Sequence, residues 1–546
     1  MNKIARFLQE HLDGEVFASA AVREYFSTDA SVLKIPPQMV VYPAGKNDVR
    51  KVARFCWQLA EKGRLLPITP RGRGTDQAGA AIGSGVVMAF PAHMNKLLEI
   101  DTKQRMVRLQ PGANFGAVQD TLQTHGFYLP PYPASLNYST IGGAIANNCA
   151  GERSLKYGPI ADWVDQLEVV LANGEIIYTE RVSKRELNRR KGLSTMEGEI
   201  YRQVDGLITD NWDLLKKYAD SRQVSKNSSG YNLTAVKQSD GSFDLTPLFV
   251  GSQGTLGVVT EAILRFAPYT PQSELLVAEF ASLEAAGQAV EELLKLKPCS
   301  LEMVDRRLLE FVQKHQPDLL KDLVGEDGAM PEVVLLAEFD NPSHKRSKLA
   351  KKAAKAIEGK VKRLRRSDEF YEQQRFWAIR HSAASVVNFN DSGRAALPII
   401  EDGVVPRRAL VEYIEKVYQL LDKHHLEAAV WGHAGDANLH LQPLLDLSKI
   451  AERQKAFKLM QEYYSMVIAL GGSVTAEHGD GRLRSPYLVK QHGLDVVELF
   501  SQLKKIFDPY GTLNPGVKLH TDVADLVPLL RQDYSLRHLA DHLPRT

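Results

Sequence analysis

Hydrophobic positions in the first half of the chain form short runs that predict strands alternating with helices. Between about residues 38 and 180, β-rich runs such as MVVYP, LLPITP and GVVMAF alternate with helical stretches over 47–62 and 115–125, and Gly or Pro separates them. Residues 1–35 predict a helical lead-in, which ends where two consecutive prolines impose an extended chain. The pattern therefore predicts an α/β or α+β domain over 36–270.

The pattern of hydrophobic positions changes after about residue 180. Residues 181–245 are more polar and weakly periodic, which predicts a helical insertion in the first domain. From 271 to 520, the strand-like LLVAEF, the helical LEAAGQAVEELLKL and a second strand and helix in the same order predict another sheet with helices on one face. Residues 521–546 predict a helical tail.

Composition narrows the class of protein. The chain has 546 residues, 44% hydrophobic and 25% charged, with a formal net charge of +2, which indicates a globular protein of two to four domains without a global attraction to nucleic acid. It has no apolar run of about 18 residues and no secretory signal at its start, so we expect a cytoplasmic protein without a transmembrane segment. Three scattered cysteines do not form a zinc or iron–sulfur motif.

One basic stretch stands out from this balance. Lys345–Lys352 with Lys360–Arg366 is typical of a solvated helix face. The alternative is a docking patch for an electron acceptor or for the anionic inner face of a membrane, which would make contact with the membrane peripheral.

Three glycine-rich clusters lie in the first domain, at 70–79, 133–158 and 251–260. Glycine lets backbone N–H groups converge on an anion and lets a large planar ligand approach the chain closely. A dinucleotide G-x-G-x-x-G is not present, because Gln77 stands where it would need glycine. A P-loop is not present either, because no Gly-Lys-Ser/Thr follows after four spacer residues. One such cluster is more often a turn, but three in one domain favour a cofactor site.

Polar residues suited to catalysis and metal binding gather in glycine-rich turns of the last third. His433 and His440 bracket Ala-Gly-Asp-Ala-Asn-Leu, and the pair Glu477-His478 follows in a later turn. Imidazole and carboxylate groups are suitable ligands for zinc or a similar divalent ion. A lone histidine would more often be structural, but this set favours a metal or catalytic centre.

Six ordered motifs between about 36 and 519 resemble one family: RGRGTDQAG, PAS…STIGGAIANNCAG…KYG, GSQGTLGVVTEA, WGHAGDANLH, TAEHGDGR and DPYGTLNPGVKL. The chain resembles the FAD-dependent oxidoreductases of the vanillyl-alcohol oxidase (PCMH-type) family, in the D-2-hydroxyacid dehydrogenase branch that acts on D-lactate, glycolate or D-2-hydroxyglutarate. The resemblance implies an α+β fold: an FAD-binding domain of two α/β subdomains and a cap with an antiparallel sheet flanked by helices. It also implies that the chain returns to complete the flavin site.

The resemblance assigns roles to individual positions. The pyrophosphate of noncovalent FAD would lie at the 71–75 loop and the 139–143 turn, the flavin along 147–158, and the adenine near 258–259, while residue 514 reaches back to the isoalloxazine. The implied cofactor residues are Arg71, Gly72, Arg73, Gly74, Thr75, Gly79, Pro133, Ser135, Ser139, Thr140, Gly142, Gly143, Asn147, Gly151, Tyr157, Gly158, Gly254, Val258, Val259 and Asn514.

The implied chemistry is oxidation of a D-2-hydroxy acid to a 2-oxo acid. His478 is the expected base, Arg380 the residue that grips the substrate carboxylate, and Asn438 belongs to the same catalytic set. His433, His440 and Glu477 would hold a divalent zinc, manganese or iron ion that orients the substrate.

Departures from the family pattern leave the substrate open. Ala437 replaces a usual glycine, Gln253 a frequent glutamate, and Ile400-Glu401-Asp402 stands where relatives that bind dicarboxylates have a Lys before an Asp. A separate electron acceptor is expected: a quinone, a cytochrome, another electron-transfer protein or oxygen. The alternatives are an oxidase of another alcohol and a noncatalytic flavin subunit of an electron-transfer complex.

Overall fold

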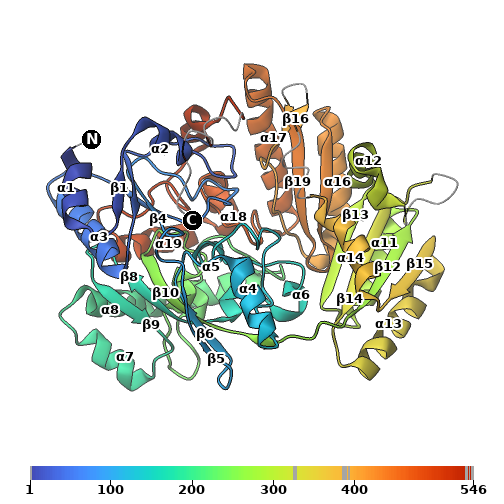
Figure 1. Ribbon diagram of the computed structural model, residues 1–546, viewed down its shortest axis with the longest axis horizontal. Coiled ribbons are helices and arrows are strands. Elements are labelled where there is room, and N and C mark those ends of the chain that lie inside the picture. The colour runs from blue at the N-terminus through green and yellow to red at the C-terminus, as the bar shows by residue number, and fades with distance from the viewer. Residues whose placement is uncertain are drawn as a thin grey trace.

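A computed structural model describes residues 3–321, 323, 329–383, 390–391, 394–534, 539 and 542. The described chain forms an N-terminal part and a cap, which lie next to each other along the long axis of the molecule (Figure 1). Within these ranges no helix is both long enough and apolar enough to cross a membrane.

The first sheet has the order β1-β2-β4-β3. Strands β2 (Met39–Tyr42), β4 (Val86–Ala89) and β3 (Ile68–Arg71) are parallel, and helix α3 (Lys46–Glu61) covers them. The predicted helical lead-in contains α1 (Lys3–His11) and α2 (Ala20–Tyr25), but also strand β1 (Glu15–Phe17), which pairs antiparallel with β2. The lead-in is thus part of this sheet, because Val16 is buried in the same core as α3.

The second sheet is antiparallel, with the order β5-β6-β10-β8-β9. Its strands are β5 (Leu97–Asp101), β6 (Met106–Leu109), β8 (Val164–Val170), β9 (Ile176–Thr179) and β10 (Val258–Arg265). Helices α4 (Phe115–Thr124) and α5 (Ile141–Asn147) share its core. The inserted segment forms α7 (Lys184–Lys191), α8 (Met196–Asp210) and α9 (Trp212–Ser221).

The cap is built on one eight-stranded antiparallel sheet with the order β15-β12-β14-β13-β18-β19-β17-β16. Its strands are β12 (Glu274–Phe280), β13 (Ser300–Asp305), β14 (Val333–Phe339), β15 (Arg363–Ser367), β16 (Asn390–Asp391), β17 (Arg394–Ala396), β18 (Ala428–His433) and β19 (Asn438–Leu445). The predicted antiparallel sheet flanked by helices is confirmed.

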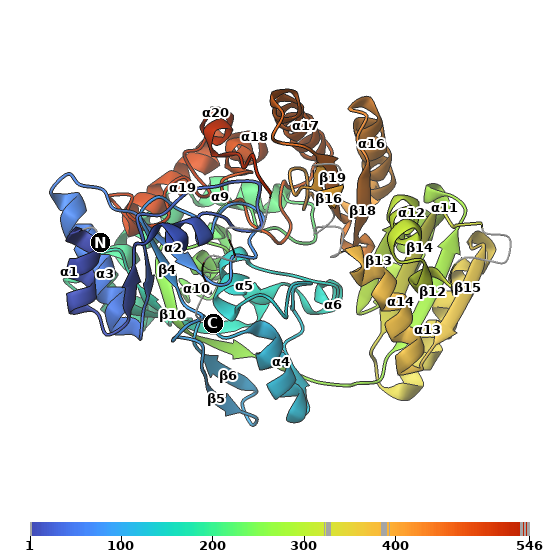
Figure 2. The same cartoon turned by 45° about the horizontal axis from the view of Figure 1, so that its top comes forward.

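Helices cover both faces of the cap sheet, so the expectation of one covered face is wrong. Helices α11 (Leu283–Leu294), α13 (Ser343–Ile357), α16 (Leu410–Lys423) and α17 (Ile450–Ala469) share a core with one face. Helices α12 (Arg306–His315) and α14 (Phe370–His381) pack on the other. Alternate residues of the strands point into the two cores, as strand geometry requires. The basic helix α13 lies at the end of the cap that is remote from the N-terminal part (Figures 1 and 2).

After α17 the chain returns to the N-terminal part. Helix α18 (Leu488–His492) and helix α19 (Leu494–Phe507) bury Leu488, Leu499 and Phe500 in the core of the second sheet. In both views helix α19 therefore lies with the blue and green elements rather than with the cap (Figures 1 and 2). Leu513 then bridges to Ile68 of β3, so a segment near the C-terminus joins the first sheet. The tail begins with α20 (Val523–Leu526).

Candidate active site

A cavity of about 700 Å³ lies between the N-terminal part and the cap. The loop after β3, the segment 132–152 and the turn before β10 line it from one side, and side chains of α14, β18 and β19 line it from the other. This volume is within the usual range for the site of a cofactor or a drug-sized ligand. All three glycine-rich clusters found in the sequence thus open onto one space.

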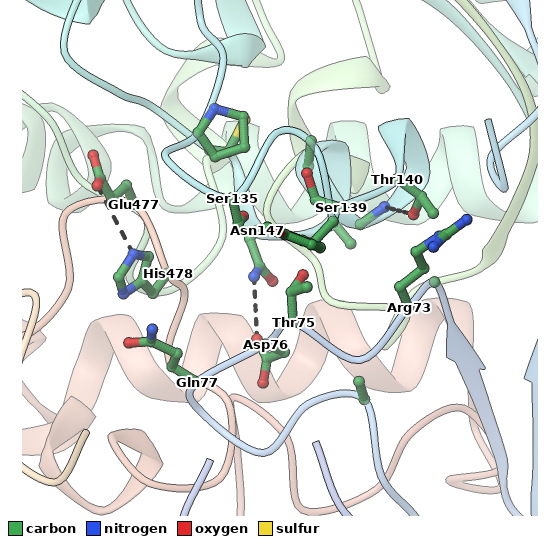
Figure 3. A pocket seen from close by; sticks show the side chains of 18 of the residues that line it. Arg73, Thr75, Asp76, Gln77, Ser135, Ser139, Thr140, Asn147, Glu477 and His478 are labelled. Carbon is green, nitrogen blue, oxygen red and sulfur yellow. Dashed lines mark hydrogen bonds and ion pairs between the residues drawn. The ribbon is translucent and has the colours of Figure 1, made fainter. Parts of the chain in front are cut away.

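Most of the predicted cofactor residues line this cavity. They are Arg71, Gly72, Arg73, Gly74, Thr75, Pro133, Ser135, Ser139, Thr140, Gly142, Gly143, Asn147, Gly151, Gly254 and Val259. Figure 3 shows Arg73, Ser139 and Thr140 on one side of the close-up and Glu477 with His478 on the other. The cavity therefore connects the candidate phosphate-binding loops to the candidate catalytic residues.

Several polar groups in the cavity wall, Gln442 Oε1 among them, make no hydrogen bond with the described residues, as expected where a ligand binds. Ser139 is 5% exposed, and its Oγ makes no hydrogen bond. The exposed side chain of Arg73 has no described ion-pair or hydrogen-bond partner, although it lies at the wall. A buried hydroxyl and a free guanidinium suit the oxygens of a phosphate-bearing cofactor, so the residues present fit FAD.

Close backbone packing supports the shape of this wall. A Cβ on Gly151 would come 1.9 Å from the Tyr132 carbonyl oxygen. The Asn147 Nδ2 donates to Asp76 Oδ1 at 3.1 Å, which ties the second glycine-rich cluster to the first. Asp76 in turn accepts hydrogen bonds from the backbone N–H groups of Ala78 and Ala80. The glycine and the aspartate thus set the spacing between two walls.

Five predicted cofactor residues lie outside the lining. Gly79 has φ +81°, and a Cβ there would meet Leu33, while Gly158 has φ +76° beside Asp162. Tyr157 donates its hydroxyl to Asp340 of the cap at 2.5 Å. Val258 is buried in the core of the first sheet.

Asn514, the fifth, is fully buried and links three segments. Its Oδ1 accepts from Thr69 Oγ1 at 3.0 Å, and its Nδ2 donates to the carbonyl oxygens of Ala80 and Gln253 at 2.8 Å each. These contacts join β3, the first glycine-rich loop and the third one. The structure places Asn514 as a support behind the cavity wall.

The predicted metal ligands come together at one end of the cavity. Glu477 Oε1 lies 3.2 Å from His433 Nε2 and 3.3 Å from His440 Nε2. His478 Nε2 is 3.8 Å from the same oxygen. Ligand atoms of His433, His440 and Glu477 all lie within 4.8 Å of one another. A set of imidazole nitrogens and a carboxylate oxygen suits zinc, manganese or iron, so the residues present fit a divalent ion.

Acidic residues fix the outer nitrogens of these histidines. His433 Nδ1 lies 2.7 Å from Glu302 Oε1, and His478 Nδ1 lies 2.7 Å from Glu401 Oε2, which is also 3.5 Å from His440 Nδ1. A carboxylate on Nδ1 holds the proton there and directs Nε2 inward, the usual arrangement around metal-binding histidines. The three Nε2 atoms are therefore directed toward one point.

Arg380 lines the cavity but is already partnered. Its Nε and Nη2 donate to Glu302 Oε2 at 2.9 and 2.8 Å, and the residue is 5% exposed. Glu302 thus connects Arg380 to His433. The pairing leaves other guanidinium N–H groups of Arg380 for a substrate carboxylate, because arginine has five donors.

The charges of the cluster depend on each other. Burial disfavours an imidazolium, but the carboxylates of Glu401 and Asp402 outweigh it and raise the pKa of His478 to about 10. Glu302 likewise outweighs burial and raises the pKa of His433 to about 9. Burial would raise the pKa of Glu477, yet Lys226 and His433 hold it well below its usual range. The raised pKa values of His433 and His478 favour their imidazolium forms next to the ionised carboxylates.

Asn438 does not reach the cavity. It is fully buried, and its Nδ2 donates to the Gly403 carbonyl oxygen at 3.0 Å. Beside it, Asp402 Oδ2 accepts the backbone N–H groups of Ala476, Glu477 and His478 at 3.0, 3.1 and 2.8 Å. Asp402 therefore supports the turn that carries the base, and Asn438 Nδ2 donates to Asp402 Oδ1 at 3.4 Å.

Sequence reasoning missed several of these partners. Glu302 is a carboxylate within the otherwise apolar LEMV, which is a detectable signal. The pair Glu401-Asp402 enters the sequence analysis only as a departure from the family pattern. Its position directly after the apolar LPII is a signal that could have identified it as buried. Lys226 contacts Glu477 from the inserted segment, and no feature of the sequence pointed to it.

Comparison with known proteins assigns both parts of the chain to known domain families. Residues 37–180 match the model of an FAD binding domain, and residues 270–517 match that of the C-terminal domain of FAD linked oxidases. The glycolate oxidase subunit GlcD of Bacillus subtilis is 30% identical over 507 residues, which cover 91% of this chain and 92% of that one.

The chain belongs to the FAD-linked oxidase family. It is an FAD-linked oxidoreductase, and FAD is its cofactor class. The D-2-hydroxyglutarate dehydrogenases of Pantoea ananatis and Escherichia coli are 29% and 28% identical over 92% and 94% of this chain. The chain spans only 50% and 51% of the length of these two relatives.

Solved structures show the same fold at lower identity. The 4-ethylphenol oxidase of Gulosibacter chungangensis superimposes with a TM-score of 0.68 at 15% identity, over 95% of this chain and 96% of that one. An alkyldihydroxyacetonephosphate synthase does so with a TM-score of 0.62 at 16% identity, over 92% and 82%. The predicted PCMH-type fold is confirmed.

Proposed function

We propose that this FAD-linked oxidase converts a D-2-hydroxy acid to a 2-oxo acid. The observation that carries the proposal is the convergence of three imidazole Nε2 atoms on Glu477 Oε1, at one end of a cavity lined by the glycine-rich segments. FAD held by the glycine-rich segments would supply a hydride acceptor for the α-carbon, and a divalent zinc, manganese or iron ion held by His433, His440 and Glu477 would supply a Lewis acid for the hydroxyl.

The residues of the chain supply a base and an anchor. His478 accepts the hydroxyl proton at Nε2, while Glu401 keeps the other proton on Nδ1. His433, His440 and Glu477 would hold the ion, and its charge would disfavour a proton on the neighbouring Nε2 of His478. Arg380, fixed by Glu302, binds the substrate carboxylate.

FAD is bound noncovalently in this proposal. The only thiol in the lining is Cys149, whose Sγ donates to the Pro131 carbonyl oxygen at 3.2 Å. Burial raises the pKa of Cys149 strongly, which makes it a poor nucleophile for attachment to a flavin. Arg71 and Gly72 occupy the loop where a covalent link would otherwise be expected.

Electrons leave the reduced flavin to a separate acceptor, such as a quinone, a cytochrome or an electron-transfer protein. The three cysteines are each buried and unpaired, so they do not form an internal electron relay. A cytoplasmic location with peripheral contact at the inner face of a membrane stays a prediction that accompanies this proposal.

An anaerobic experiment tests the chemistry. FAD-loaded protein supplied with zinc or manganese is mixed with a panel of D- and L-2-hydroxy acids, and the absorbance of oxidised flavin is followed. We expect bleaching by D-acids only. No bleaching by any acid would contradict the proposal and favour another alcohol as substrate or a noncatalytic flavin subunit.

A further inference from the structure

We propose that Lys226 is a positioning residue that holds one oxygen of Glu477, so that the carboxylate offers only its other oxygen to a metal ion. The inference rests on the proposed function, because it concerns the metal centre of that function. The inference goes beyond the proposed function by assigning a role to the inserted segment, which contains none of the family motifs.

The contacts of Glu477 divide its two oxygens. Lys226 Nζ lies 2.6 Å from Oε2, and the side chains of the two residues are 3% and 7% exposed. Oε1 instead faces the Nε2 atoms of His433 and His440 at 3.2 and 3.3 Å. One oxygen is therefore engaged by an ammonium group, while the other is directed toward the point where the imidazoles meet.

The backbone around Lys226 is clamped to the turn that carries Glu477. Ser228 Oγ donates to the Ala476 carbonyl oxygen at 2.8 Å, and the Ser228 N–H donates to the Thr475 carbonyl oxygen at 3.2 Å. On the same segment, Asn227 Oδ1 accepts from Ser473 Oγ at 2.6 Å. These bonds fix the register of 226–228 against 473–477, so the main chain at Lys226 lies next to the turn that carries Glu477.

A second carboxylate limits the movement of the lysine. Asp436 Oδ2 lies 4.0 Å from Lys226 Nζ, and Asp436 Oδ1 is paired with Arg407 at 3.5 Å. The lysine is thus enclosed between two acids and cannot turn into solvent. A carboxylate held at one oxygen ligates through the other, which leaves coordination positions open for a hydroxyl and a carboxylate of the substrate.

The test measures the affinity for Zn²⁺ of FAD-loaded protein after treatment with a chelator, by competition with a chromophoric chelator. We expect Lys226→Met to bind Zn²⁺ at least about tenfold more weakly than the unmodified chain, as is usual when a partner of a metal ligand is lost. Lys226→Arg, which keeps the charge, should recover most of the affinity. With Co²⁺ as the probe, the visible spectrum should change in Lys226→Met and remain unchanged in Lys226→Arg.

The matched control is Lys504→Met. Lys504 Nζ pairs with buried Asp508 at 2.6 Å, and its side chain is 12% exposed, but it has no contact with the histidine cluster. This variant should keep its affinity for Zn²⁺. FAD content and thermal denaturation check the fold of each variant, and Lys226→Gln, which keeps a neutral N–H donor, replaces Lys226→Met if the latter does not fold.

The outcomes separate this inference from the proposed function. If the unmodified chain binds no Zn²⁺, the metal centre of the proposed function fails. If it binds Zn²⁺ and Lys226→Met binds as tightly or more tightly, only the role of Lys226 is overturned. An equal loss in Lys226→Arg or in Lys504→Met would also overturn it, because the effect would then reflect general disruption rather than the held oxygen.

Discussion

His478 Nδ1 lies 2.7 Å from Glu401 Oε2, and this contact decides which nitrogen of the imidazole faces the cavity. Glu401 is itself paired with Arg484, which is fully buried. A carboxylate fixed in this way keeps the Nδ1 proton and leaves Nε2 as the basic atom.

Replacing the base should stop the chemistry without emptying the site. In His478→Ala, we expect anaerobic flavin reduction by the best D-2-hydroxy acid to slow by about 10²–10⁴-fold, the usual contribution of a positioned general base. Stopped-flow absorbance measures the rate, and the flavin spectrum measures bound FAD, which should persist.

The matched control is His424→Ala. His424 is a buried histidine, with a side chain 8% exposed, that pairs with Glu462, and neither residue lines the cavity. Its rate of flavin reduction should be unchanged. A normal rate in His478→Ala would remove this histidine from the mechanism.

Loss of a predicted metal ligand should remove the ion and spare the flavin. In His440→Ala, we expect bound zinc or manganese, measured by elemental analysis after dialysis, to fall from about one ion per chain to near zero, because only two of the three protein ligands remain. His424→Ala should retain the ion. Full metal content in His440→Ala would show that the ion is bound elsewhere.

Arg73 should contribute affinity for FAD. Its exposed side chain at the cavity wall has no described ion-pair or hydrogen-bond partner, so a charge-assisted contact with a phosphate is available. In Arg73→Ala, we expect the Kd for FAD to rise by about 10–100-fold, which corresponds to about 1.5–3 kcal/mol for a hydrogen bond to a charged group. Titration of the apoprotein with FAD, followed by flavin fluorescence, measures the change.

Arg64 offers the control for Arg73. It is exposed in the loop before β3 and does not line the cavity. Arg64→Ala should bind FAD as the unmodified chain does. If both variants lose affinity equally, the effect would be one of overall charge.

The ionisation of Asp305, a residue of the cap, should make the free energy of unfolding depend on pH. It accepts the Leu308 N–H at the start of α12 and the Tyr418 hydroxyl, and burial raises its pKa to about 7. This value exceeds the roughly 3.9 of an unfolded aspartate, so the folded state binds more protons between these values. The stabilisation is complete below about pH 4 and is lost as the pH rises through 7.

Asp305→Asn keeps a helix cap but does not ionise. We compare the Tm of this variant with the Tm of the unmodified chain at two pH values. We expect the difference, variant minus unmodified chain, to be larger at pH 8 than at pH 5. The difference in the free energy of unfolding is at most about 2.7 kcal/mol, because about two pH units lie between pH 5 and the pKa of about 7 and each corresponds to about 1.36 kcal/mol. Thermal denaturation at the two pH values measures it, and an equal offset at both would contradict the prediction.

Local sequence was enough to locate most of the cavity wall. Glycine-rich turns keep their backbone character wherever they are placed, and 15 of the 20 predicted cofactor residues line the cavity. The exceptions, such as Val258 and Asn514, lie next to lining segments but point into the protein. A motif shows that a segment approaches the ligand, but the side on which each residue faces depends on packing behind it.

The ligand types of the catalytic cluster were also readable, because His433, His440 and Glu477 occur in short glycine-rich turns. Their partners were not. Glu302 comes from another cap strand and Lys226 from an insertion, 131 and 251 residues away from the groups they hold. Such pairs form only when the eight-stranded sheet and the returning C-terminal segment bring distant parts of the chain together.

The chain's order of apolar runs, glycine turns and polar clusters was therefore sufficient for the family, the two-part architecture and the residue types of the site. The orientation of each imidazole and the charge that surrounds it were settled by long-range contacts. Burial makes these contacts strong, because a charge removed from water must be paired, and the sequence does not state which distant residue will pair with it.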